Sequence, residues 1–151
     1  MKKKPKPPAG KRRVSSSFEL LADIRSLQKI RQAIEAQAVT LGISRNRIYR
    51  VLLAVEEATS NVIRHAYDGK GKSKPLYIDV EMSRHAVKIL IRDVGKTFNF
   101  ERHPSNRIVR LALQKRSRGG YGVHLIKSIM DKYEYVRNAD GENHLRLVKK
   151  L

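Results

Sequence analysis

The chain has 151 residues, of which 40% are hydrophobic, and this is enough for one buried core. No run approaches the roughly 20 apolar residues that a membrane-spanning helix needs, and the absence of cysteine excludes disulfide scaffolds, cysteine-ligated metal sites and thiol nucleophiles. Because 33 Lys and Arg residues face 14 Asp and Glu, the formal net charge is +19, which favours a phosphate-bearing ligand, an acidic partner or a nucleic acid.

Residues 1–13 combine Lys, Arg, Pro and Gly with no periodic apolar residue, so they predict a disordered basic tail. No apolar stretch follows these lysines, and the chain start therefore does not resemble a secretory signal. We expect a cytoplasmic protein whose residues 14–151 form a single domain.

The domain begins with a strand predicted over residues 14–21 by alternating apolar side chains. From 23 to 41, apolar residues recur every three or four positions, which predicts an amphipathic helix; Asp23 can cap its start, and Gly42 is placed for a left-handed stop. A longer helix is predicted over residues 44–66, with a broad apolar stripe suited to packing on a sheet.

A turn rich in Gly and Lys at 68–75 precedes two strands, 76–82 and 87–92, whose tight connection predicts an antiparallel pair. Residues 94–118 are strongly basic and aperiodic, and a loop of this length is usually functional or mobile. A glycine cluster at 119–122 then leads into a short helix.

Two last strands, 132–137 and 144–149, follow this helix and are joined by a turn. The predicted fold class is therefore α+β, a two-layer α/β sandwich with a mostly antiparallel mixed sheet and about three helices on one face.

The longer helix carries the segment VEEATSNVIRHAY, in which Glu57, Asn61 and His65 are spaced four and four and so share one helical face. A carboxylate one turn before an amide suits a metal–nucleotide site, because the amide oxygen is a hard ligand for Mg²⁺ and the carboxylate can position a hydroxyl or water. The alternative is a solvated polar stripe. Glu56 points about 100° away, so we expect it on the surface.

Two further segments suit a nucleotide. In IRDVGKTF, Asp93 ends a strand and can accept the exocyclic amine of adenine, while Gly95 permits a close approach to the backbone; an ordinary Asp-x-Gly turn is the alternative. In RGGYGVHLIKSIMD, Gly120 and Gly122 open a helix whose free N–H groups can bind phosphate, although glycines also start helices for packing reasons.

The order of these three segments resembles the GHKL (Bergerat-fold) ATPase superfamily, and within it the anti-sigma factor serine kinases. The likeness spans about residues 14–151 and includes the closing GENHLRLVKKL. It implies that Glu57 is the general base, Asn61 the Mg²⁺ ligand, Asp93 the adenine-reading carboxylate and Gly95 the glycine beside it. It likewise implies that Gly120 and Gly122 form the phosphate loop and that residues 98–118 form a lid over ATP.

The resemblance implies a serine/threonine protein kinase that uses ATP and Mg²⁺. Its implied substrate is an anti-anti-sigma (STAS-domain) protein, and its implied binding partner is a sigma factor. Relatives also suggest a homodimer. Thr97 departs from the family pattern, because it occupies the second glycine position of D-x-G-x-G. This departure supports an alternative, a non-catalytic ATP-binding module that grips an acidic protein. The chain has no recognised motif for specific nucleic-acid binding, and only its charge favours such a partner.

Overall fold

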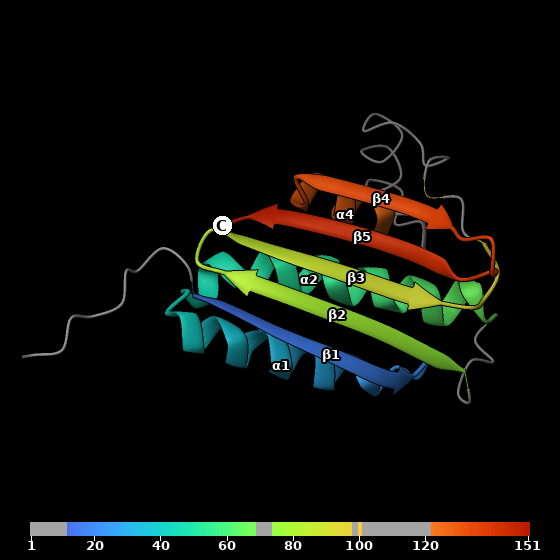
Figure 1. Cartoon of the computed structure of the whole chain (residues 1–151), viewed down its shortest axis with the longest axis horizontal. Coiled ribbons are helices and arrows are strands. Elements are labelled where there is room, and N and C mark those ends of the chain that lie inside the picture. The colour runs from blue at the N-terminus through green and yellow to red at the C-terminus, as the bar shows by residue number, and fades with distance from the viewer. Residues whose placement is uncertain (1–11, 69–73, 98–99, 101–121) are drawn as a thin grey trace, which may run out of the picture.

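One five-stranded sheet forms the front layer of the molecule (Figure 1). The structure is a computed structural model that describes residues 12–68, 74–97, 100 and 122–151. The strands are β1 (Arg13–Leu21), β2 (Pro75–Ser83), β3 (Ala86–Asp93), β4 (Lys132–Arg137) and β5 (Asn143–Lys150). Their spatial order is β1-β2-β3-β5-β4, and every neighbouring pair is antiparallel.

Three α-helices within the described residues cover one face of this sheet, as Figure 1 shows. They are α1 (Ser26–Leu41), α2 (Arg45–Asn61) and α4 (Gly122–Ile129), and a π-helical turn, η1 (Val62–Ala66), continues directly from α2. The predicted two-layer sandwich with its helices on one face is confirmed. None of the described helices has the length and apolar character that crossing a membrane requires.

The first helix begins three residues later than its apolar period predicted. Residues 22–25 instead form a turn, in which the Asp23 carboxylate accepts the backbone N–H of Arg25 at 2.9 Å and the Ser26 hydroxyl donates to the Leu21 carbonyl at 2.8 Å. The predicted stop is confirmed, because Gly42 adopts the left-handed conformation with φ 67°.

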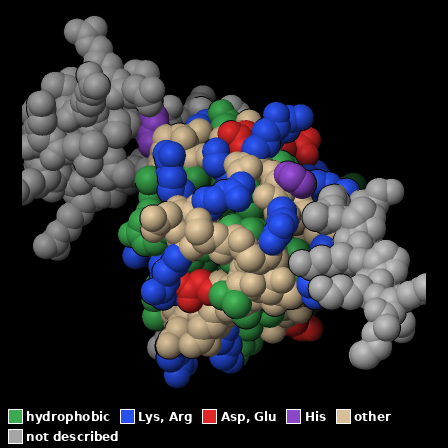
Figure 2. Space-filling model, turned by 90° about the vertical axis from the view of Figure 1, so that its left-hand side faces the viewer, with side chains coloured by type: hydrophobic (Ala, Val, Ile, Leu, Met, Phe, Trp, Pro, Cys, Tyr) green, Lys and Arg blue, Asp and Glu red, His purple; other side chains and the backbone are tan. Residues whose placement is uncertain are grey.

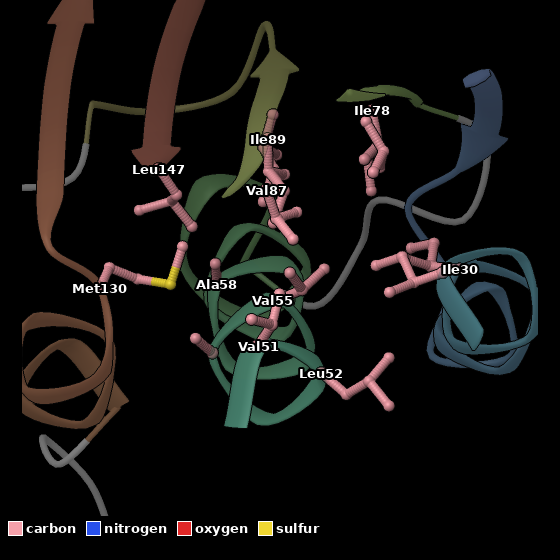
Figure 3. Close-up of a cluster of buried hydrophobic side chains, with 14 of the residues drawn as sticks. Ile30, Val51, Leu52, Val55, Ala58, Ile78, Val87, Ile89, Met130 and Leu147 are labelled. Carbon is pink, nitrogen blue, oxygen red and sulfur yellow. The ribbon is translucent and has the colours of Figure 1, made fainter. Parts of the chain in front are cut away.

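The core lies between the sheet and the helices. Strand residues alternate between the covered face and the open face, so that every second side chain of β2 is buried. In Figure 3 the strand side chains point from the sheet toward α2, with α1 and α4 on either side. The labelled residues of this core are Ile30, Val51, Leu52, Val55, Ala58, Ile78, Val87, Ile89, Met130 and Leu147.

Two positions of α1 test this placement of the core. Ile34 is 0% exposed and Val39 is 78% exposed. We predict that Ile34→Ala lowers the free energy of unfolding by about 2–5 kcal/mol, because it removes buried methyl groups and leaves a cavity. Val39→Ala should change it by less than about 0.5 kcal/mol. Urea denaturation of both variants checks this, and equal effects would contradict the assigned face.

Candidate functional site

Asp93 is the buried polar residue around which the site is built. It ends β3 opposite Asn143 of β5, and it is only 3% exposed. Its Oδ1 accepts two hydrogen bonds, from the Gly95 backbone N–H at 2.9 Å and from Asn143 Nδ2 at 2.9 Å. Within the described residues no hydrogen bond reaches Oδ2, so Oδ1 is the oxygen that fixes the side chain.

Burial raises the pKa of Asp93 above the usual carboxyl range. The two hydrogen bonds to Oδ1 and the charge of Arg137 oppose this rise, because each favours the ionised carboxylate. A carboxylate that remains partly desolvated in this way is a strong acceptor for a donor brought by a ligand.

Arg137 and Asn143 hold the Asp93 turn in place, and the sequence analysis missed both. Asn143 is 0% exposed; its Nδ2 also donates to the Gly95 carbonyl at 3.1 Å. Arg137 Nη1 donates to Asn143 Oδ1 at 2.9 Å, to the Gly95 carbonyl at 3.0 Å and to the Thr97 hydroxyl at 3.2 Å. The threonine at the second glycine position is therefore part of this network.

Gly95 lies against η1. A Cβ at this position would come within 2.5 Å of the Ala66 carbonyl oxygen and 2.6 Å of Ala66 Cβ, so only glycine fits. The Lys96 N–H donates to that same carbonyl at 2.8 Å. Tyr67 completes the junction, because its hydroxyl donates to the Pro75 carbonyl at 3.0 Å and accepts the Val94 N–H at 3.1 Å.

Glu57 and Asn61 occupy the last turns of α2, one helical turn apart. Both side chains are half-buried, and neither has a hydrogen bond or ion pair to another described residue. Gly122, the first residue of α4, lies against Glu57, since a Cβ there would come within 2.0 Å of Glu57 Oε1. The missing side chain of Gly122 thus makes room for the Glu57 carboxylate.

A small pocket of ≈ 20 Å³ connects these elements. Asn61 and Asp93 are its two polar, non-aromatic lining residues. The ring of Phe100 is buried beside it, nearly parallel to the Tyr135 ring at 6.3 Å. The remaining lining residues are apolar or aromatic: Ala58, Val62, Ala66, Phe100, Ile126, Tyr135 and Leu145.

The structure thus brings most of the predicted site residues together. Asn61 and Asp93 line one pocket, Gly95 packs against Ala66, which also lines it, and Glu57 lies against Gly122. Gly120 and the predicted lid 98–118, apart from Phe100, lie outside the described residues. Glu56 points away from this site, and it is partly buried by an ion pair with Arg31.

Comparison with known proteins places this chain in a family. The histidine kinase-like ATPase domain family matches residues 20–149, and the chain belongs to that family. Its relatives include the serine-protein kinase RsbW of Bacillus pumilus, 25% identical over 114 residues, or 73% of this chain and 70% of the relative. RsbW of Bacillus subtilis is 27% identical over 120 residues, covering 74% and 71% of the two chains.

Two solved structures share the fold. The RsbU and RsbW domains of Rv1364c from Mycobacterium tuberculosis match with a TM-score of 0.62 at 14% identity, covering 91% of this chain and 32% of that one. The SiaB–SiaC complex from Pseudomonas aeruginosa matches with a TM-score of 0.60 at 13% identity, covering 90% and 89%.

The raised pKa of Asp93 predicts how the free energy of unfolding changes with pH. Between the ordinary and the raised pKa the folded state binds more protons than the unfolded state, so the free energy of unfolding falls as the pH rises through that window. At neutral pH the buried charge therefore lowers stability. We predict that Asp93→Asn raises the melting temperature of the nucleotide-free protein at about pH 7, and that the gain shrinks toward about pH 4.

The matched control is Asp140→Asn, which changes an exposed aspartate in the β4–β5 turn. Differential scanning calorimetry of both variants across this pH range measures the effect. A lower melting temperature for Asp93→Asn at neutral pH, or an equal gain for Asp140→Asn, would contradict the assigned role of burial.

Proposed function

We propose that the chain is an ATP-dependent serine/threonine protein kinase that works as an anti-sigma regulatory factor. In this proposal it phosphorylates a STAS-domain antagonist and, when that antagonist is phosphorylated, sequesters a sigma factor. The observation that carries the proposal is the buried Asp93 carboxylate, which is held through Oδ1 by Gly95 and Asn143 and lines a pocket together with Asn61. The RsbW relatives, which are named serine-protein kinases, support it.

The base end of the pocket suits adenine. Oδ2 of Asp93 is an unpartnered acceptor among the described residues, which matches the exocyclic amine that adenine has and guanine lacks at that ring position. The apolar side chains around it, such as Ala58 and Ile126, suit a flat ring. Arg137 and Asn143 keep the carboxylate in one orientation, so little ordering is required when the base binds.

The phosphate end suits a metal-bound triphosphate. The Asn61 side-chain oxygen is of the type that Mg²⁺ accepts, and Mg²⁺ needs few protein ligands because it keeps several waters and binds phosphate oxygens. Mg²⁺-bound ATP would supply the γ-phosphoryl group for transfer. Glu57, one turn away and without another described partner, orients the attacking Ser or Thr hydroxyl and accepts its proton.

The second candidate is a binding module without catalysis. Thr97 favours it, because Arg137 holds the threonine hydroxyl and so stiffens the position where the family pattern has a glycine before the lid. Such a module would bind ATP and grip an acidic protein partner without transferring phosphate. For the kinase and for the binding module alike, the homodimer and the identity of the protein partner stay predictions.

Glu57→Gln separates the two candidates. We predict that it lowers phosphate transfer to a STAS-domain substrate by about 10²–10⁴-fold, because the amide cannot accept the proton, while ATP affinity changes little. Transfer is measured with labelled ATP–Mg²⁺ and a panel of STAS-domain proteins, and affinity by calorimetry. Glu56→Gln is the control, since Glu56 is ion-paired to Arg31 away from the pocket.

Wild-type protein that binds ATP but transfers nothing to any of these substrates would favour the binding module. Transfer by Glu57→Gln at the wild-type rate would remove Glu57 from the mechanism.

A further inference from the structure

One end of the molecule carries a cluster of exposed cations that the nucleotide site does not use. There β1, β3 and α2 begin, and β2 and β5 end (Figure 1). Figure 2 looks onto this end and shows Lys and Arg side chains spread over it, with few acidic ones. We call it the basic end face, formed by the exposed residues Arg12, Arg13, Arg45, Arg47, Arg84 and Lys150.

Hydrogen bonds and strand register bring these residues to one end. Arg13 pairs with Ser83 across the β1–β2 ladder, beside Arg84. Arg47 Nη2 donates to the Arg84 carbonyl at 3.5 Å, and Lys150 pairs with Ala86 across β3 and β5. The fold therefore brings these cations together at one end from segments that are far apart in the sequence.

Acidic side chains neutralise little of this face. Arg13 is ion-paired with Glu81 at 3.1 Å, and Arg45 approaches Glu35 at 4.0 Å. The other four cations form no ion pair with any described residue. Exposed pairs of this kind contribute little to stability, so the cluster is not explained as a stabilising network.

Helix α2 begins with basic residues, although acidic residues are favoured at a helix N-terminus. Ser44 is its N-cap without a side-chain cap, and no acidic residue occupies its first turn. Arg45 and Arg47 stand at the first and third helical positions instead, although the positive end of the helix dipole favours acids there. In a capping box the third position would be Glu or Gln. The start of α2 is therefore less stable than it would be with acidic residues, and it adds positive charge to this face.

The ATP pocket does not account for these charges. β3 runs 8 residues from Ala86, beside the basic end face, to Asp93 in the pocket, a separation of roughly 25 Å. At physiological ionic strength charges this far apart are screened from one another, because the Debye length is about 8 Å. The proposed ATP site therefore does not explain the charge of this face.

We propose that the basic end face binds the phosphate backbone of nucleic acid without reading its sequence. Guanidinium groups form paired hydrogen bonds with phosphate, and five of the six cations of this face are arginines. One of them, Arg84, also donates from Nε to the Leu41 carbonyl at 2.7 Å.

Cations predominate over large apolar side chains at this end: among the described residues, the exposed ones near it are Val39 in the last turn of α1 and Tyr49 in the second turn of α2. Protein and membrane partners normally require a larger apolar centre. The sequence also continues from Arg12 into residues 1–11, which contain five lysines.

The test uses the 151-residue chain and a mixed-sequence DNA duplex, with binding followed by fluorescence anisotropy. If about four phosphates are contacted, affinity should fall on the order of 100-fold between about 50 and 200 mM salt. Arg45→Glu/Arg47→Glu should make the slope of log affinity against log salt shallower by about 2. The same double variant should not lower the melting temperature, because Glu suits the start of α2.

The matched control is Arg64→Glu/Lys74→Glu, which changes the net charge equally at two exposed positions of the opposite end. It should leave the slope unchanged. Equal weakening by both double variants would show that only net charge matters and would overturn the proposal. Tighter binding of polyglutamate or of phosphatidylserine vesicles than of DNA would overturn it as well, in favour of an acidic protein or a membrane. These results are independent of ATP binding and kinase activity.

Discussion

The hydrogen bond between Asn143 and Asp93 is the interaction on which the site depends. It joins the ends of β3 and β5 and occupies one oxygen of a carboxylate that has little access to water. Arg137 in turn holds Asn143 by donating a hydrogen bond to its side-chain oxygen. Gly95 donates to the same Asp93 oxygen as Asn143, so that both hydrogen bonds fix the Asp93 side chain, which lines the pocket. The proposed recognition of adenine through one hydrogen bond requires this kind of preorganisation.

The two ends of the molecule show the same relation between stability and function. At one end a buried carboxylate has a raised pKa, so its ionised form lowers stability at neutral pH. At the other end arginines replace the acids that would stabilise the start of α2. In each place an unfavourable charge lies where the proposed ligand carries a complementary group: the adenine amine at Asp93, and phosphate at the arginines. The well-packed core between them, with residues such as Ile78 and Leu147 fully buried, tolerates both exceptions.

Local patterns were sufficient to predict the helices and the strands, because periodicity and glycine placement are local signals. The site roles of Asn61, Asp93 and Gly122 stay predictions. The network around Asp93 was not predictable in the same way. Arg137 and Asn143 are register partners in the β4–β5 hairpin, which the predicted turn could have indicated. That Asn143 also faces Asp93 depends on β5 lying beside β3, a pairing between segments 50 residues apart. The contact of Gly95 with Ala66 depends on η1, and no local pattern signals a π-helical turn.

The central claim, that Asp93 reads an adenine base in this pocket, is tested most directly by calorimetric titration of ATP–Mg²⁺ and GTP–Mg²⁺ into wild type and Asp93→Asn. The account predicts that wild type binds ATP and discriminates strongly against GTP, and that the variant loses about 10–100-fold in ATP affinity, as expected for a hydrogen bond to a charged group. Equal affinity of wild type for the two nucleotides, or an unchanged ATP affinity of the variant, would contradict it.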